Sequence, residues 1–326
     1  MTTAPNLPAI EGLLPVWVVG ARPSVATAAW IALAILDRVR GHARPTDVLR
    51  EATRYLAARG VEGPEATAEA LLRYVLRTDR IGLYSREVGL SIAEAKSLSR
   101  ALCERCTGVP LEYIVGERQF RDLVLATEPG VFIPRPETEL LVDAALEAIA
   151  GIEAPVVVDV GTGNGAIALS LKQARSDARV IATDVSLAAV TLARRNADRH
   201  GLEVQVLRGS YLDPVPDALR ETMSLVVSNP PYVNREEYEA LPDEVRAEPC
   251  EALVGGTKFH TELAELATSW LAVGGWLVVE IGADQGHQVR AIFDRAGLEA
   301  LGVLPDLAGR DRIARGRRGH RTARVT

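Results

Sequence analysis

Apolar and polar positions alternate along this chain with two different periods, and the change comes near residue 110. Between Thr46 and Leu102, apolar residues recur every three or four positions, which places them on one face of a helix. Three helices are predicted there. The first begins with Thr46 as its N-cap and ends by Gly60, the second follows Gly63-Pro64, and the third opens with the capping box Ser91-Ile-Ala-Glu94. The pattern therefore predicts a small all-helical domain.

The second half of the chain alternates strands with helices. Tyr113 to Val115 and Phe120 to Leu125 are predicted as short strands of a hairpin, followed by an irregular loop. Further strands are predicted at 156–158, 180–182, 204–206, 225–227 and 276–279, and helices at 166–174, 186–200 and 260–271. Such alternation indicates an α/β fold, with a mostly parallel sheet covered by helices on both faces. Ligands of these folds bind beyond the carboxyl ends of the strands.

Composition narrows the class of protein. With 326 residues, 48% of them hydrophobic, and a net charge of −6, the chain fits a soluble protein of about two domains. Three cysteines are too few for a disulfide framework, so a reducing, cytoplasmic setting is expected, and no spacing of Cys or His predicts a metal site. The longest apolar run, Val25 to Leu36, is shorter than the about 20 residues of a membrane span and predicts a helix in an N-terminal extension.

The first two strands of this sheet end in residues suited to a nucleoside cofactor. Gly161-Thr162-Gly163-Asn164-Gly165 follows the first strand and leads directly into a helix, so its glycines allow a tight turn and close approach of a ligand. This loop alone does not distinguish a nicotinamide dinucleotide from S-adenosylmethionine. Asp184 ends the second strand, where a carboxylate accepts ribose hydroxyls or caps the next helix. Tyr211 follows the third strand, where it stacks on adenine or serves in packing.

The fourth strand ends in Asn229-Pro230-Pro231-Tyr232, and this tetrapeptide carries the chemistry. Two prolines remove two backbone donors and fix two φ angles, which leaves carbonyl oxygens rigidly displayed. The Asn229 side-chain oxygen and the Pro230 carbonyl form two convergent acceptors that can hold both hydrogens of a planar –NH₂ group. Tyr232 offers a flat face for a planar amide or base. An enzyme that transfers a methyl group to such a nitrogen needs these acceptors to hold the –NH₂ group, whereas a dehydrogenase does not.

With these motifs the chain resembles the class I S-adenosylmethionine-dependent methyltransferases, and among them the HemK-type peptide chain release factor glutamine methyltransferases. The resemblance covers about Arg50 to Gly316. It is carried by the segments at 108–116, 132–139 (Phe-Ile-Pro-Arg-Pro-Glu-Thr-Glu), 161–165, 228–232, 280–285 and 308–312.

The resemblance implies a Rossmann-like fold and four parts of the chain. The fold has a seven-stranded, mostly parallel sheet. The parts are an N-terminal extension at 1–43, a helical substrate-recognition domain at 44–110, a hairpin linker at 111–130 and a methyltransferase domain at 131–326. The implied reaction is methylation of the glutamine in the Gly-Gly-Gln motif of release factors, with a release factor as partner and S-adenosylmethionine as cofactor.

The resemblance also implies roles for individual residues. The cofactor site is expected to comprise Gly161, Thr162, Gly163, Asn164, Gly165, Asp184, Tyr211 and Asn229. The glutamine side chain is expected against Asn229, Pro230, Pro231 and Tyr232, with Phe132 and Glu139 lining the pocket. Asn229, Pro230 and Tyr232 are the expected catalytic residues. The chain departs from the family pattern at Ser210 and at Lys258-Phe-His260, where an acidic residue and Asp-Gly-Leu are more usual.

Two alternatives remain open at this point. Asn-Pro-Pro-Tyr also occurs in adenine methyltransferases acting on DNA or RNA, but the 20 residues after Tyr232 contain two Arg and seven Asp or Glu, which disfavours nucleic acid. The other alternative is a glutamine methyltransferase of another translation protein. The end of the chain, Gly309 to Thr326, holds seven Arg and one Asp and is predicted to be a solvated terminus rather than an RNA-binding tail.

Overall fold

The computed structural model describes residues 43–319, and the chain divides into two compact units between Ile114 and Val115. The run Val25–Leu36 and nearly all of the predicted extension lie outside the described residues. None of the helices within 43–319 is long and apolar enough to cross a membrane.

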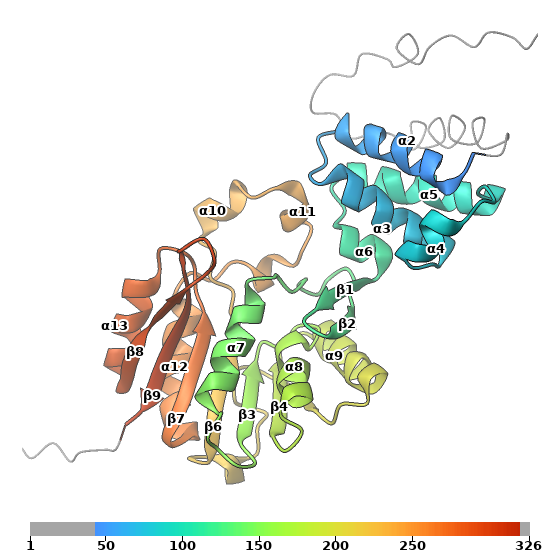
Figure 1. Cartoon of the computed structure of the whole chain (residues 1–326). Coiled ribbons are helices and arrows are strands. Elements are labelled where there is room, and N and C mark those ends of the chain that lie inside the picture. The colour runs from blue at the N-terminus through green and yellow to red at the C-terminus, as the bar shows by residue number, and fades with distance from the viewer. Residues whose placement is uncertain (1–42, 320–326) are drawn as a thin grey trace, which may run out of the picture. The chain divides into compact units, whose positions relative to one another are not determined.

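The first unit is helical, as predicted. It contains α2 (Pro45–Ala57), α3 (Pro64–Leu76), α4 (Arg80–Ser85) and α5 (Ile92–Cys106), and α6 (Leu111–Val115) lies at its end (Figure 1). Its core consists of fully buried leucines such as Leu56, Leu72 and Leu98. The predicted capping box is present, because Ser91 accepts a hydrogen bond from the Glu94 N–H and Glu94 accepts one from the Ser91 N–H.

Thr46 does not cap α2, contrary to the prediction. Arg44 is the N-cap, and Pro45 is the first helical residue. Proline suits that position because its fixed φ is helical and its missing N–H has no partner in the first turn.

The predicted hairpin exists, but with different arms. Strands β1 (Glu117–Phe120) and β2 (Leu123–Ala126) pair antiparallel around Arg121-Asp122. The predicted strand at Tyr113–Val115 is instead the helical turn α6, because the carbonyl of Pro110 accepts the N–H groups of Tyr113 and Ile114.

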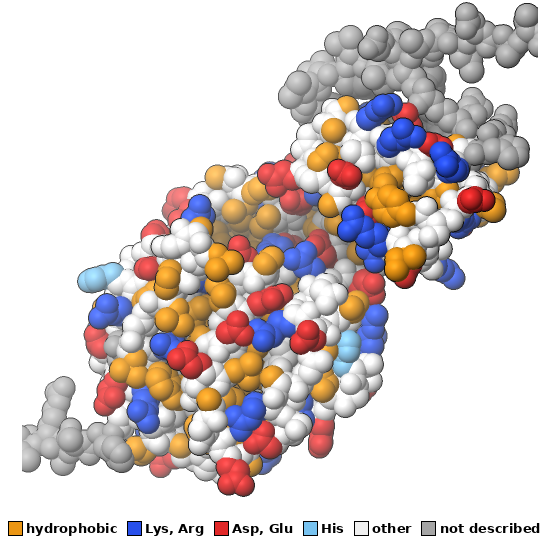
Figure 2. Space-filling model, viewed as in Figure 1, with side chains coloured by type: hydrophobic (Ala, Val, Ile, Leu, Met, Phe, Trp, Pro, Cys, Tyr) orange, Lys and Arg blue, Asp and Glu red, His pale blue; other side chains and the backbone are white. Residues whose placement is uncertain are grey.

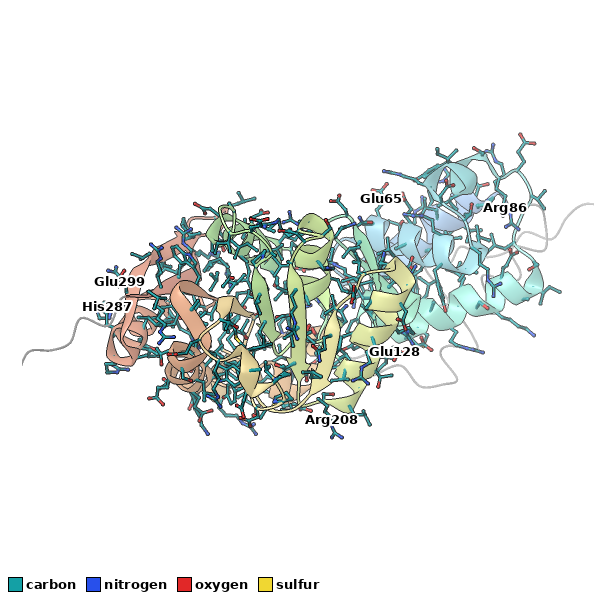
Figure 3. The ribbon with its side chains drawn as sticks, turned by 90° about the horizontal axis from the view of Figure 1, so that it is seen from below. Glu65, Arg86, Glu128, Arg208, His287 and Glu299 are labelled. Carbon is teal, nitrogen blue, oxygen red and sulfur yellow. The ribbon has the colours of Figure 1, made fainter. Side chains whose placement is uncertain are left out.

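Among the described residues, seven strands form one sheet in the second unit, in the order β5-β4-β3-β6-β7-β9-β8 (Figure 1). Neighbouring strands from β5 to β7 are parallel, and β9 is antiparallel to β7 and to β8. Figure 3 labels Arg208 on the edge strand β5 and Glu299 on β8 at the opposite edge. The strands are β3 (Val156–Val160), β4 (Arg179–Asp184), β5 (Gln205–Arg208), β6 (Met223–Ser228), β7 (Leu271–Glu280), β8 (Leu298–Pro305) and β9 (Asp311–Arg318).

Helices cover both faces of this sheet. Successive strand residues point to opposite faces, so that Val157 packs in the core with α7, α8 and α9, and Val158 in the core with α12 and α13. The helices are α7 (Thr138–Ala148), α8 (Ala166–Ala174), α9 (Leu187–His200), α10 (Arg235–Glu239), α11 (Asp243–Arg246), α12 (Lys258–Trp270) and α13 (Gly286–Ala296), with short 3₁₀ turns η2 (Asp217–Leu219) and η3 (Cys250–Ala252). The Rossmann-like α/β fold is confirmed.

The prediction of a solvated C-terminal tail is wrong for residues 311–318. They form β9, which pairs with a strand on each side and buries Ile313 and Ala314. Two of its arginines form ion pairs with distant acids, Arg315 with Glu147 at 2.9 Å and Arg318 with Glu221 at 2.5 Å. The pairing explains why a strongly basic segment is part of a sheet.

Candidate active site

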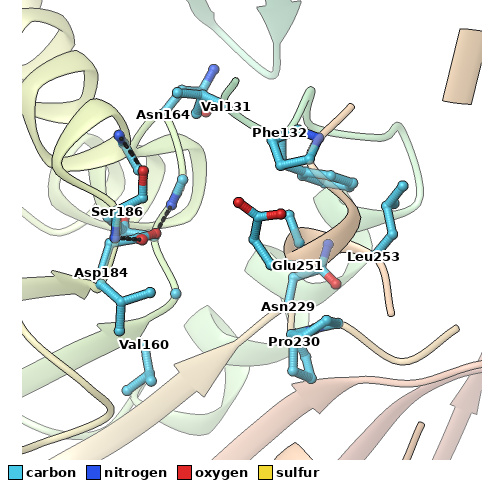
Figure 4. Close-up of a pocket in the computed structure, with 18 of the residues that line it drawn as sticks. Val131, Phe132, Val160, Asn164, Asp184, Ser186, Asn229, Pro230, Glu251 and Leu253 are labelled. Atoms are coloured by element: carbon cyan, nitrogen blue, oxygen red, sulfur yellow. Dashed lines mark hydrogen bonds between the residues drawn. The ribbon is translucent and has the colours of Figure 1, made fainter. Parts of the chain in front are cut away.

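A cavity of about 430 Å³ lies in the second unit beyond the carboxyl ends of β3, β4 and β6. This volume falls within the range of small-molecule sites. In Figure 4, Asp184 and Ser186 lie on one side of the cavity and Asn229 and Pro230 on the other, and the Glu251 carboxylate points into the space between them. The topology thus brings the predicted cofactor loop and the Asn-Pro-Pro-Tyr segment to one site.

The glycine loop after β3 presents bare backbone to this cavity. Gly161 and Gly163 have φ values of 74° and 59°, in the left-handed region, and a Cβ at either position would meet no atom within 4 Å. Gly165 has a packing role instead, because a Cβ there would lie 3.1 Å from Leu169 on α8. The open side of the loop is therefore available to a ligand.

The side chains of Thr162 and Asn164 are turned into the protein. Thr162 donates to the buried carboxylate of Asp159 at 2.6 Å, and Asn164 donates to the carbonyl of Ala126 at 3.3 Å. Burial raises the pKa of Asp159 to about 7, even though Thr162 and the Ala168 N–H donate to it. Both predicted residues line the cavity, yet their side chains hold the loop in shape.

Asp184 is half-buried at the end of β4 and stabilises the glycine loop by a hydrogen bond. Its carboxylate accepts the N–H groups of Gly163 and Ser186, each at 2.9 Å, and burial raises its pKa above the usual value. The N-cap of α9 is Ser186, which accepts from the Ala189 N–H. The capping alternative for Asp184 is therefore wrong, and the residue lines the cavity.

Tyr211 lies at the rim of the cavity in a left-handed conformation, with φ of 46°. Its hydroxyl donates to Glu262, and its ring centroid lies 4.5 Å from that of Phe259. Burial and the Glu262 carboxylate raise the pKa of Tyr211, so the hydroxyl stays protonated at neutral pH. The two rings form an apolar wall beside the glycine loop.

The Asn-Pro-Pro-Tyr segment forms the facing wall. Asn229 donates from Nδ2 to Thr138 Oγ1 at 3.0 Å, while its Oδ1 accepts no hydrogen bond from residues 43–319. The Pro230 carbonyl likewise accepts none within that range. Tyr232 donates to Glu280 at 3.0 Å, and its carbonyl accepts from Gln285 at 2.9 Å. Two acceptor oxygens with unused capacity thus come from neighbouring residues of the cavity wall.

The turn at residues 253–256 packs against the Asn-Pro-Pro-Tyr segment and fixes its position. The Val233 N–H donates to the Leu253 carbonyl at 2.9 Å, and the Val233 carbonyl accepts from the Gly255 N–H at 3.1 Å. Gly255 fits under Pro231 so closely that a Cβ would lie 2.2 Å from the Pro231 carbonyl oxygen. The proline pair is therefore fixed by direct backbone contact.

Of the two predicted pocket-lining residues from 132–139, one lines the cavity. Phe132 does so, with the Arg135 guanidinium 5.1 Å from its ring, and the buried Glu248 holds this loop through the Ile133 N–H and Arg135. Glu139 does not line it. Its carboxylate accepts the N–H of Arg121, whose left-handed turn between β1 and β2 leaves that group unpaired in the hairpin.

Three residues with contacts in the site have no role in the sequence-based predictions. Thr138 and Glu280 are buried next to Asn229 and Tyr232, and the exposed Glu251 lines the cavity and points into it (Figure 4). Glu280 ends a buried parallel strand, so the strand-end argument used for Asp184 would also have found it. Glu251 lies in an irregular acidic segment and has no such signal.

The donor set of this cavity fits S-adenosylmethionine. The bare glycine backbone leaves room for a methionine chain, Asp184 offers carboxylate oxygens to a ribose, and the Tyr211 wall suits an adenine ring. Asp184 and Glu251 also give the cavity a negative potential, which favours a sulfonium cation.

Comparison with known proteins agrees with this geometry. Residues 122–256 match the methyltransferase small domain, and residues 47–116 match the PrmC N-terminal domain. The release factor glutamine methyltransferase of Moorella thermoacetica is 41% identical over 271 residues, which is 81% of this chain and 95% of that protein. This chain belongs to the release factor glutamine methyltransferase family. It is an S-adenosylmethionine-dependent methyltransferase.

A further family member shows how far the similarity extends. The release factor glutamine methyltransferase of Geobacter sulfurreducens is 36% identical over 295 residues, which is 89% of this chain and 98% of that protein. Among solved structures, a methyltransferase from Pyrococcus furiosus matches with a TM-score of 0.46 and 18% identity over 61% of this chain and 90% of that chain.

Proposed function

We propose that this enzyme transfers a methyl group from S-adenosylmethionine to the side-chain amide nitrogen of the glutamine in the Gly-Gly-Gln motif of peptide chain release factors. The observation that supports it best is the pair of acceptors at the cavity wall, Asn229 Oδ1 and the Pro230 carbonyl, neither of which has a donor among residues 43–319. An –NH₂ group with two hydrogens is the complementary ligand. The names of the relatives point to the same substrate.

The chemical difficulty is that an amide nitrogen is a poor nucleophile, because its lone pair is delocalised into the carbonyl. The acceptors at Asn229 and Pro230 hold the two N–H bonds, aim the nitrogen at the methyl donor and increase its electron density. Alignment of this kind lowers a barrier by about 7–11 kcal/mol. When bound, S-adenosylmethionine supplies an electrophilic methyl group on a sulfonium. The Tyr232 ring supports the plane of the amide.

Positive charge develops on the nitrogen as the new bond forms. The same two oxygens stabilise it, since they are preorganised and partly shielded from water. We assign no general base to the enzyme. His260, the nearest histidine in sequence, is fully buried, binds the Glu280 carbonyl and has a pKa lowered by burial. The methylated amide is acidic enough to lose its proton to water.

The parts of the chain have distinct roles in this proposal. The cofactor is held by Gly161 to Gly165, Asp184 and Tyr211, and the glutamine by the 229–232 segment with Phe132. The helical domain at 44–110 recognises the release factor, and the hairpin at 111–130 links it to the methyltransferase domain at 131–326. Because release factors act in translation, we place the enzyme in the cytoplasm.

The charge distribution favours a protein substrate over nucleic acid. Residues 233–252, which follow the catalytic segment, carry seven acidic residues and two arginines. On the face seen in Figure 2, Lys and Arg of the second unit are interspersed with Asp and Glu rather than gathered in one patch. A protein that grips phosphates needs a basic groove.

The decisive experiment offers methyl-labelled S-adenosylmethionine and the enzyme to a release factor, plasmid DNA and ribosomal RNA in parallel. We expect label only in the release factor, with mass spectrometry locating one methyl group on the Gly-Gly-Gln glutamine. Label in DNA or RNA, or on a different residue of the protein, would contradict the proposal.

Replacing Asn229 tests the acceptor pair directly. Asn229→Ala removes one oxygen that binds the –NH₂ group, and we expect kcat/KM to fall about 100- to 1,000-fold. Rates are measured with the release factor, and folding is checked by the melting temperature. Unchanged turnover in a folded variant would rule out this mechanism.

A further inference from the structure

A series of hydrogen bonds leads from Asn229 to the buried side chains of Thr138 and Glu280. Asn229 Nδ2 lies 3.0 Å from Thr138 Oγ1, and Thr138 Oγ1 lies 2.8 Å from Glu280 Oε2. The other oxygen of the same carboxylate, Oε1, accepts from the Tyr232 hydroxyl at 3.0 Å. Thr138 begins α7 and Glu280 ends β7, so three separate elements meet at this point.

Water cannot easily replace the hydrogen bond between Thr138 and Glu280. Thr138 is 2% exposed and Glu280 is 1% exposed. Burial raises the pKa of Glu280, while the hydrogen bonds from Thr138 and Tyr232 and the positive charge of Arg312 act in the opposite direction. The His260 side chain binds the Glu280 carbonyl at 2.9 Å. Each oxygen of this carboxylate has one hydroxyl donor, Thr138 on Oε2 and Tyr232 on Oε1, and with both donors in place the group acts as an acceptor only.

Which group donates in each of these hydrogen bonds determines the orientation of the Asn229 side-chain amide. A threonine hydroxyl has one hydrogen, and Thr138 gives it to Glu280. Its remaining lone pairs can only accept, so the group of Asn229 that faces Thr138 must be the –NH₂. The Asn229 oxygen is thereby left on the other side. This reasoning does not depend on telling nitrogen from oxygen in the amide by their positions.

We propose that Thr138 and Glu280 are positioning residues that lock Asn229 with its oxygen toward the substrate and so select glutamine over glutamate. The inference rests on the proposed function. An oxygen in that position accepts from the –NH₂ of a glutamine and repels the carboxylate of a glutamate. An Asn229 turned the other way would offer its own –NH₂ and would favour the carboxylate.

Thr138→Val and Thr138→Ser form a matched pair for the test. Valine has the shape of threonine but neither donates nor accepts, so both orientations of Asn229 become accessible. Serine keeps the hydroxyl and loses only a methyl group. Rates are measured with the release factor that the wild-type enzyme methylates. The preference for glutamine over glutamate is measured as inhibition by two short peptides, one containing Gly-Gly-Gln and the other Gly-Gly-Glu. The affinity for S-adenosylmethionine is measured by calorimetry.

For Thr138→Val we expect kcat/KM to fall at least tenfold and the preference for the glutamine peptide over the glutamate peptide to fall at least tenfold. The affinity for S-adenosylmethionine should stay within threefold, and Thr138→Ser should restore both losses to within threefold of wild type. A merely structural role would lower the melting temperature and leave the peptide preference intact. That result, or equal loss in the serine and valine variants, would overturn the inference.

The outcome also separates this inference from the proposed function. If wild type methylates the release factor glutamine and Thr138→Val does so with unchanged preference, only the positioning role fails. If wild type methylates no release factor, the proposed function fails and the selectivity argument fails with it.

Discussion

At the scale of single residues, Gly255 makes the closest approach to a backbone atom among the described glycines, at Pro231. A Cβ on Gly255 would lie 2.2 Å from the Pro231 carbonyl oxygen, a backbone atom that cannot rotate away. Gly255→Ala should therefore displace the 229–232 segment, lower kcat/KM about 100-fold and cost about 1–3 kcal/mol of stability. Gly151→Ala is the control, because a Cβ there meets nothing within 4 Å and its φ is not positive. Equal activity of the two variants would contradict this packing.

Asp159 predicts a particular pH dependence of stability. Burial raises its pKa to about 7, against about 3.9 in an unfolded chain. Between pH 4 and 7 the native state therefore binds more protons than the unfolded state, so this group makes the free energy of unfolding fall as pH rises, by up to about 1.4 kcal/mol per pH unit. In Asp159→Asn this contribution is absent. Urea unfolding of both proteins from pH 4 to 7 should show wild type losing stability relative to the variant.

A second aspartate serves as the control for that series. Asp177 is exposed, and its hydrogen bond with Arg175 lowers its pKa to about 2. Its contribution is fully present above about pH 4 and is lost only as pH falls toward 2. The stability difference between wild type and Asp177→Asn should thus stay constant from pH 4 to 7. If the stability difference between wild type and Asp177→Asn changed with pH as steeply as that expected for Asp159, the pH dependence would have to come from another group.

At the scale of elements, β9 shows that charge pattern and burial can disagree. Its basic sequence resembles a solvated tail, but its partners on both sides make it an interior strand. Ile313→Ala should cost about 2–5 kcal/mol, because the side chain is 1% exposed. Arg310→Ala, in the exposed turn before β9, should change stability by about 0.5 kcal/mol or less. Chemical unfolding measures both, and a cost below about 1 kcal/mol for Ile313→Ala would show that β9 is not part of the core.

At the scale of the whole molecule, two units with separate cores should respond differently to the cofactor. All residues that line the cavity belong to the second unit. At 100 times its Kd, S-adenosylmethionine stabilises the state that binds it by about 2.7 kcal/mol. Hydrogen exchange with and without it should show added protection in the loops after β3, β4 and β6, and unchanged exchange in α2, α3 and α5. Protection that extends through those three helices would indicate coupled units.

Local patterns in the sequence determined much of this protein. The β-branched runs became β3 to β7 because strands buried on both faces need continuous apolar sequence. The glycine loop and the Asn-Pro-Pro-Tyr segment could be interpreted in advance, because glycine and proline act on their own backbone angles and donors whatever surrounds them. Family resemblance, which rests on the same local motifs, then identified the enzyme class.

Only the tertiary structure decided which distant groups meet. It turned Glu139 toward the Arg121 N–H and away from the cavity, and it placed Thr138 and Glu280, 142 positions apart, within hydrogen-bonding distance behind Asn229. It also placed β9 in the sheet between β7 and β8. The physical reason is the same in each case: a polar or charged side chain is placed by the partner that compensates its burial, and no local pattern names that partner.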